Sequence, residues 1–180
     1  GADVTVFDVD VARMRYIDEV WGGRIGTRFS SPLAVREACG ESDVVIGSVL
    51  VPGARTPHLV DHEMVLGMVP GSVLVDVAVD QGGCFEDSHP TTHADPTFVV
   101  GGSVFYCVAN MPGAVPHTST YALTNATMRY VVLLADEGWR GACGLRGELR
   151  RGLATHGGRL VSAPVGEALG IESVGVSEVL

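Results

Sequence analysis

The residues best suited to chemistry lie in the segment 75–86, where an apolar run ends at Asp80 and two glycines follow almost at once. This pattern is typical of a buried strand that carries a carboxylate to the rim of a sheet and then turns sharply. Because ligands bind at the carboxyl ends of strands in open α/β sheets, Asp80 is expected where a proton acceptor would act. An ordinary turn formed by Asp and Gly explains the same residues, and this spacing alone leaves both interpretations open.

Two other polar side chains stand at the ends of predicted strands. Asp8 ends the first apolar run, and Asn110 follows the run 104–108. In dinucleotide-binding folds such an acid accepts hydrogen bonds from ribose hydroxyls, and an amide there can bind a carboxamide or a carbonyl group. A helix cap for Asp8 and a plain turn for Asn110 are the alternatives. The nearby Asp10 would repel a 2′-phosphate, which favours NAD over NADP.

The histidines are spaced as zinc ligands can be, but their surroundings argue against a metal. His58 and His62 are four residues apart, as are His89 and His93. Two histidines one helical turn apart can bind zinc. Pro90 interrupts any helix through the second pair, and neither pair has a glutamate in the position that zinc proteases use. We therefore expect no metal site. The chain also has no Gly-x-Ser-x-Gly elbow and no P-loop.

The elements that must position these side chains alternate between strands and helices. Strands are predicted at 4–7, 25–29, 44–49, 72–79, 98–100 and 104–108, and helices at 11–20, 32–39 and 61–68. This alternation predicts an α/β fold with a doubly wound parallel sheet. The rhythm ends after Pro116. The longest helix is predicted at 119–137, where Gly138 stops it, and a further helix with a closing strand is expected within 161–180.

Composition narrows the functions that the chain can have. Its 180 residues are 46% hydrophobic and 18% charged, enough for one domain with a full core or for one domain and part of another. The net charge of −9 and the complete absence of lysine argue against nucleic acid, anionic membranes and Schiff-base chemistry. No apolar stretch reaches the ~18 residues of a membrane span, and no signal peptide is visible. Four widely spaced cysteines favour the cytoplasm.

Several segments together resemble the alanine dehydrogenase branch of the alanine dehydrogenase and proton-translocating transhydrogenase family. They are 1–8, 46–57, 70–86 with 90–93, and 106–128, so that the likeness covers nearly the whole chain. The resemblance implies a Rossmann-type NAD-binding domain at 1–117 that lacks its first strand and its glycine loop. It also implies that 118–180 is the carboxy-terminal part of the substrate domain, beginning with the long helix.

The resemblance further implies reversible, NAD-dependent oxidative deamination of L-alanine to pyruvate and ammonium, with Asp80 catalytic. Asp8, Arg13 and Ser30 would lie around the adenosine ribose, and Val49 and Leu50 on the adenine side. Two short segments would surround the nicotinamide. They are Val77, Ala78, Val79 and Asp80, and Val108, Ala109, Asn110 and Met111.

Departures from the family pattern limit these expectations. The family's amino-terminal half supplies a catalytic histidine and the Lys and Arg that hold the substrate carboxylate, and none of it lies in this chain, so we expect these 180 residues alone to be inactive. Some relatives carry a Glu and a His as a metal pair in the long helix, but Leu133 and Glu137 stand at those positions here.

Relatives assemble as hexamers, which implies a homo-oligomer. A nucleotide-binding module without chemistry, such as a transhydrogenase-like subunit, is the alternative; a methyltransferase has little support.

Overall fold

The structure is a computed structural model that describes residues 1–51 and 56–180. The chain divides into two compact units. The first contains residues 1–49 and 57–109, and the second contains residues 110–180 together with Leu50, Val51 and Thr56. Nearly all of the predicted site residues belong to the first unit, and Leu50, Asn110 and Met111 belong to the second.

The first unit begins with two strands in parallel, each followed by a helix. These elements are β1 (Thr5–Asp8), α1 (Val11–Trp21), β2 (Gly26–Phe29) and α2 (Pro32–Glu41). β1 and β2 pair from Thr5 opposite Gly26 to Asp8 opposite Phe29. Side-chain oxygens accept from free N–H groups at the start of both helices, since Asp10 caps α1 and Ser31 caps α2.

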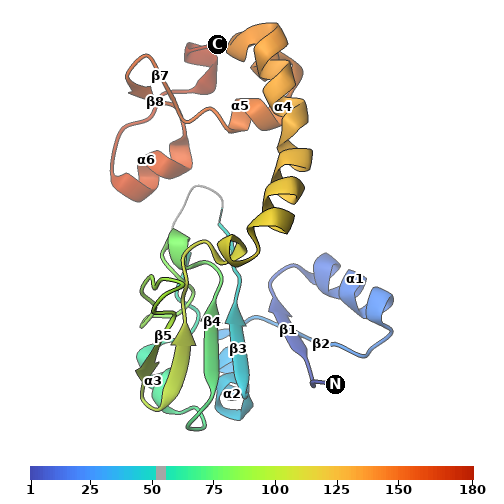
Figure 1. Cartoon of the computed structure of the whole chain (residues 1–180), viewed down its shortest axis with the longest axis vertical. Helices are drawn as coiled ribbons and strands as arrows, with labels where there is room; N and C mark the ends of the chain where they lie inside the picture. The colour runs from blue at the N-terminus through green and yellow to red at the C-terminus, as the bar shows by residue number, and fades with distance from the viewer. Residues whose placement is uncertain (52–55) are drawn as a thin grey trace. The chain divides into compact units, whose positions relative to one another are not determined.

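A second sheet of four strands forms the larger part of this unit. Its order is β3 (Val44–Gly47), β4 (Val73–Asp76), β6 (Ser103–Tyr106) and β5 (Thr97–Val100). β3, β4 and β6 run parallel, whereas β5 is antiparallel to β6, as Figure 1 shows. Only Gly101 and Gly102, both at positive φ, separate β5 from β6. So short a connection can join only antiparallel strands.

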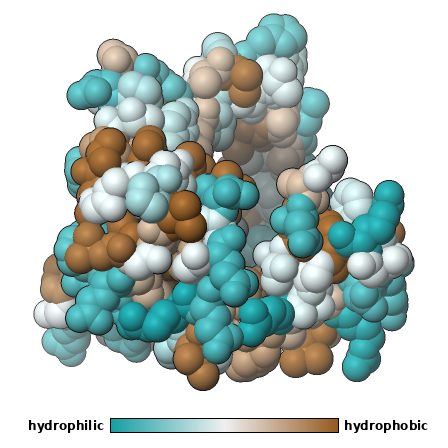
Figure 2. Space-filling model, turned by 90° about the horizontal axis from the view of Figure 1, so that it is seen from below, coloured by the Kyte–Doolittle hydropathy of each residue, from teal (hydrophilic) through white to brown (hydrophobic). Residues whose placement is uncertain are grey.

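The core lies between this sheet and the helices α2 and α3 (His62–Leu66). Phe105 of β6 is wholly buried and contacts Phe85 edge-on at 6.1 Å and Phe98 in a stack at 5.0 Å between ring centres. Apolar side chains elsewhere in the unit, among them Ile46 and Val99, remain exposed. Hydrophobic residues are also visible among hydrophilic ones on the face that Figure 2 presents.

The second unit is mostly helical. Its elements are η2 (Met111–Ala114), α4 (Pro116–Leu145), α5 (Gly147–Arg151), β7 (Thr155–His156), β8 (Arg159–Leu160), α6 (Ala163–Leu169) and η3 (Val176–Glu178). Its small core contains Ala142, Cys143, Val161 and Val179. None of the helices within the described ranges is both long enough and apolar enough to traverse a membrane.

The predicted α/β architecture with a parallel sheet is confirmed, but several predicted ends are wrong. α2 continues through Gly40 to Glu41, and the long helix begins at Pro116 rather than at residue 119. The predicted stop at Gly138 is confirmed, since its φ of 66° and ψ of 169° are not helical and divide α4 into two helical stretches. The chain after β3, β4 and β6 remains apolar although the strands have ended. After β4 and β6 the apolar residues Ala78, Val79, Cys107 and Val108 are buried outside the sheet, so burial extended these apolar runs beyond the hydrogen-bonded strands.

Candidate functional site

The first group of site residues lies at the carboxyl end of β1. Asp8 is its last residue and is half-buried, and its Oδ1 accepts the backbone N–H groups of Val9 at 2.7 Å and Asp10 at 3.0 Å. The N–H of Ser30 donates to the Asp8 carbonyl at 2.9 Å. Within the described ranges, Oδ2 of Asp8 has no hydrogen-bond partner. This oxygen can therefore accept hydrogen bonds from the hydroxyls of a ligand.

Asp10 and Arg13 flank this group at the start of α1. Oδ1 of Asp10 accepts the N–H groups of Ala12 at 2.9 Å and Arg13 at 3.1 Å, while the Arg13 side chain is exposed. Asp10 is thus the cap of α1, which was the alternative role for Asp8. Its carboxylate still places negative charge beside Asp8, in keeping with a ribose that carries no phosphate.

The second group lies beyond the carboxyl end of β4. The strand ends at Asp76, and Asp80 follows it in a short 3-10 turn, η1 (Val79–Gln81). The turn is closed by the N–H of Gln81, which donates to the Ala78 carbonyl at 2.9 Å. Val77 and Asp80 are exposed, whereas Ala78 and Val79 are buried. Asp80 was predicted at the end of the strand; it lies instead four residues later, on a tight turn that presents its carboxylate to solvent.

Sequence reasoning missed Asp76, which is the acid that ends the strand. Its side chain is wholly buried. Its Oδ1 accepts the N–H of Ala78 at 3.0 Å, and its Oδ2 accepts the N–H of Cys84 at 2.8 Å and the hydroxyl of Ser88 at 2.5 Å. The available signal was an acid with apolar neighbours on both sides, since a carboxylate in such a run must find donors nearby.

The third group follows β6. Val108 is wholly buried, and Ala109 donates its N–H to the Thr91 carbonyl at 3.2 Å. Asn110 comes next, with φ at 55°, and is the only residue other than glycine with positive φ in the described part of the chain. Asparagine tolerates this left-handed conformation better than most residues. The conformation ends the extended run and starts η2 at Met111.

The electrostatics of the first unit are set by burial and by hydrogen bonds. Burial raises the pKa of the Cys84 and Cys107 thiols, and the charge of Asp76 contributes in the same direction. A hydrogen bond to the Asp87 carboxylate, 3.0 Å from Nδ1, raises the pKa of His62. In the two described stretches, no three His, Cys, Asp or Glu side chains are grouped so as to hold a metal ion.

The structure brings some of the predicted site residues together and separates others. β4 and β6 are paired neighbours, so the segments that follow them leave the same edge of one sheet. β1 belongs to a separate two-stranded sheet, although Figure 1 shows it pointing the same way as β3 and β4. Of the predicted cofactor-binding set, Ala78, Val79 and Val108 are buried.

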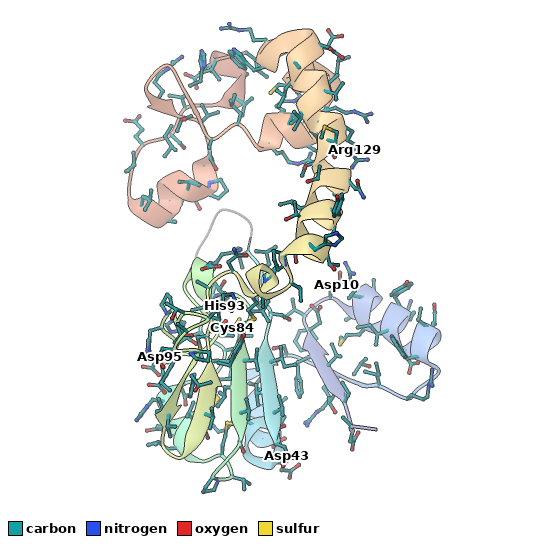
Figure 3. The ribbon with its side chains drawn as sticks, in the orientation of Figure 1. Asp10, Asp43, Cys84, His93, Asp95 and Arg129 are labelled. Carbon is teal, nitrogen blue, oxygen red and sulfur yellow. The ribbon has the colours of Figure 1, made fainter. Side chains whose placement is uncertain are left out.

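The second unit contains a cavity of about 320 Å³ on α4 and α5. Its lining includes Arg129, which Figure 3 labels, together with Tyr130, Leu133, Leu145 and Arg146. None of the predicted site residues lines this cavity. The candidate site is therefore the strand-end segments of the first unit with the residues that directly continue them.

Residues 1–163 match the protein-family model described as "Alanine dehydrogenase/PNT, C-terminal domain". The alanine dehydrogenase of Mycolicibacterium smegmatis is 59% identical over 94% of this chain and 46% of its own length. That of Halomonas elongata is 56% identical over 97% of this chain and 47% of its own. The chain thus spans about half the length of these relatives.

Solved structures resemble the chain in the same way. One titled L-alanine dehydrogenase matches with a TM-score of 0.80 and 46% identity, over 94% of this chain and 47% of the other. A transhydrogenase from Sinorhizobium meliloti matches with a TM-score of 0.58 and 28% identity, over 67% of this chain. The match to the dehydrogenase structure therefore has the higher sequence identity, coverage of this chain and TM-score of the two.

Proposed function

The chain belongs to the alanine dehydrogenase/PNT C-terminal domain family, and we propose that it is the nucleotide-binding part of an NAD-dependent L-alanine dehydrogenase. The reaction converts L-alanine, NAD⁺ and water into pyruvate, ammonium, NADH and a proton, and runs in both directions. The observation that carries the proposal is the 59% identity to an alanine dehydrogenase across 94% of the chain. The geometry of the strand ends supports the roles that we propose for individual residues.

The environment of Asp8 fits the adenosine half of NAD. Its Oδ2 can accept a hydrogen bond from a ribose hydroxyl, and the hydrogen bond from Ser30 to the Asp8 carbonyl keeps these two residues adjacent. Negative charge from Asp10 disfavours a 2′-phosphate and thus NADP. Arg13, Val49 and Leu50 complete the proposed adenosine side.

The exposed residues after β4 fit the nicotinamide half. When bound, NAD⁺ accepts the hydride from the Cα of alanine. Loss of that hydride leaves an iminium group, which water must attack and which then releases ammonium, so a proton acceptor is required. Asp80 is an exposed carboxylate on a tight turn beyond β4, where it can orient the water or accept its proton. Val77 and the segment 108–111 are the proposed neighbours of the nicotinamide.

The full-length protein that contains this chain tests the proposal. With L-alanine and NAD⁺ it should form NADH, followed by its absorbance. Asp80→Asn keeps the size of the side chain but removes the proton acceptor, and should lower kcat by about 10²-fold or more. Asp43→Asn is the matched control, since Asp43 is exposed and precedes β3 at the opposite end of the sheet. Full activity of Asp80→Asn would refute its catalytic role.

A second candidate is a nucleotide-binding module without chemistry of its own. The match to a transhydrogenase and the half-length coverage of the relatives favour it. Both candidates predict that the 180 residues alone bind NADH, and we propose that they do not turn over L-alanine, because half of the site would come from elsewhere. Lack of NADH formation by the full-length protein would favour the module.

Three further properties belong to the proposal. Residues 118–180 are assigned to the substrate domain, with 1–117 as the nucleotide-binding domain.

The protein is a homo-oligomer, and the exposed apolar residues Leu123, Met128 and Val131 of α4 provide a contact surface. Light scattering would give the number of subunits. The four cysteines, all free and buried, suit the reducing conditions of the cytoplasm.

A further inference from the structure

We propose that Asp76 is a positioning residue for the reaction, because its buried carboxylate holds in place the turn that presents Asp80. The inference rests on the catalytic role proposed for Asp80, which is distinct from that of Asp76. Asp76 is buried beneath the rim of the sheet and does not reach solvent. It acts on the reaction only through the loop that it binds.

One carboxylate fixes three points of the segment that follows β4. Oδ1 accepts the N–H of Ala78 at 3.0 Å, which turns the chain out of the strand. Oδ2 accepts the N–H of Cys84 at 2.8 Å and the hydroxyl of Ser88 at 2.5 Å, which brings the far end of the segment back to the same carboxylate. Figure 3 shows Cys84 at the end of the sheet opposite to Asp43.

Asp80 lies between the first two of these points. It follows Ala78 by two residues and precedes Cys84 by four. The turn between them is short and closed by its own hydrogen bonds, including those from the N–H groups of Gln81 and Gly83 to the Ala78 carbonyl at 2.9 and 3.1 Å. With both ends bound to one buried side chain, the turn can shift little relative to β4. The position of the Asp80 carboxylate is thereby set against the sheet.

The chemistry of Asp76 suits this role better than a purely stabilising one. A buried carboxylate without a cation is unfavourable unless hydrogen-bond donors surround it, and in the described residues Asp76 has three donors and no ion pair. An apolar side chain would continue the core with less desolvation, as Leu74 does two residues earlier on the same strand. What the carboxylate adds is the capacity to accept several hydrogen bonds from one loop.

Gly83 packs closely against the carboxylate of Asp76 and the side chain of Ser88. A Cβ at Gly83 would stand 2.8 Å from Oδ2 of Asp76 and 2.9 Å from Cβ of Ser88, and Gly83 has φ at 81°. Only glycine fits both the conformation and the close approach of the loop to the carboxylate. Gly83 therefore allows the loop to pass close to the Asp76 carboxylate, and the three donors hold the loop there.

The kinetic test uses the full-length protein with two substitutions. Asp76→Asn keeps the volume of the side chain but turns an amide toward one of the donors, and Ser88→Ala removes one donor while leaving the charge. A displacement of about 1 Å at a catalytic group can lower the rate by about 10²-fold. We expect kcat to fall by about 10- to 100-fold in Asp76→Asn and by less in Ser88→Ala. Asp43→Asn should keep the wild-type rate.

Binding distinguishes positioning from a general defect. ADP-ribose lacks the nicotinamide and tests only the adenosine side, so its inhibition constant should change less than about twofold in both variants. Loss of ADP-ribose binding in parallel with kcat would overturn the inference, because Asp76 would then support the fold as a whole. A kcat within about twofold of wild type in both variants would overturn it as well.

Cysteine labelling provides a readout that does not depend on activity. Cys84 and Cys39 are both buried, but only Cys84 has its N–H bound to Asp76. N-ethylmaleimide followed by peptide mass mapping should label Cys84 about tenfold faster in both variants, with Cys39 still protected. Ser88→Ala retains the charge of Asp76, so faster labelling there cannot arise from a lower pKa of the thiol. Equal labelling of Cys39 and Cys84 would indicate unfolding and overturn the inference.

The two proposals can fail separately. If the wild-type protein forms no NADH from L-alanine, the proposed function fails, and selective labelling of Cys84 still decides whether Asp76 holds the turn. If the wild type is active and Asp80→Asn is inactive, but both loop variants keep the full kcat, the proposed function stands and the positioning role is wrong.

Discussion

Gly47 provides the sharpest test of how closely β3 packs against the loop after β4. It is the last residue of β3 and is buried. A Cβ at this position would stand 2.6 Å from Cβ of Cys84 and 2.9 Å from Cζ of Phe85. Both of these side chains are wholly buried in the core. Gly47→Ala therefore cannot be accommodated without moving the loop, which is the same segment that presents Asp80.

The expected cost follows from these two contacts. Added methyl groups in a packed core destabilise by about 1–3 kcal/mol. Because two fixed core groups obstruct the methyl group, we expect the upper end, about 3 kcal/mol. For a domain of this size a change of 1 kcal/mol shifts Tm by roughly 2–4 °C, so that Gly47→Ala should lower Tm by about 6–12 °C. It should also lower kcat, since the turn that carries Asp80 is displaced.

Gly40→Ala is the matched control. Gly40 lies within α2, has ordinary helical φ, and no other atom lies within 4 Å of the position that its Cβ would take. Replacing glycine by alanine inside a helix stabilises by about 0.5–1 kcal/mol, so Tm should rise slightly. Scanning fluorimetry of the full-length protein measures both variants. A Tm for Gly47→Ala within about 2 °C of wild type would show that Cys84 and Phe85 yield easily, and would refute the reasoning.

Three further predictions concern other parts of the chain. Asp10→Ala removes the cap of α1 and should lower the free energy of unfolding by about 1 kcal/mol in urea titration; an unchanged midpoint would contradict the cap. Gly138→Ala places a side chain at φ 66° and ψ 169°, and its Cβ would meet no other atom within 4 Å, so only backbone strain opposes it. The free energy of unfolding should fall by about 1–3 kcal/mol, and equal or greater stability would show that the kink is not required. The pKa of His62 is raised by Asp87, so their interaction stabilises the fold fully below the unfolded pKa of about 6.5 and this stabilisation is lost as pH rises through the folded pKa. Asp87→Asn should return the NMR titration of His62 toward its ordinary range, and an unaltered titration would refute the pairing.

Hydrophobic periodicity predicted most elements of the first unit. The helices predicted at 11–20 and 32–39 are present as α1 and α2, and the structure shows that Asp10 and Ser31 cap them. The predicted position of Asp8 at the end of β1 is confirmed. These features depend on neighbours within a few residues, and local physical chemistry is sufficient to produce them. The roles proposed for the cofactor-binding residues stay predictions.

The ends of the strands were harder to predict. Asp80 was expected to end the fourth strand, yet the hydrogen-bonded ladder stops at Asp76. Between them, Ala78 and Val79 are apolar because loop packing buries them, not because they continue the sheet, whereas Val77 is exposed. Gly138 ends the first helical stretch of α4 as predicted, but a second stretch that continues to Leu145 was not predicted.

Short-range patterns of residues were enough to predict the alternation of strands and helices and the family to which the chain belongs. That Asp76 is a buried acceptor for Ala78, Cys84 and Ser88 could be known only from the folded chain. Its three donors are spread over eleven residues of loop, and their convergence depends on how that loop packs against β3 and β6. No local pattern encodes such a convergence, because burial and hydrogen bonding at one atom are set by segments that meet only in the folded chain.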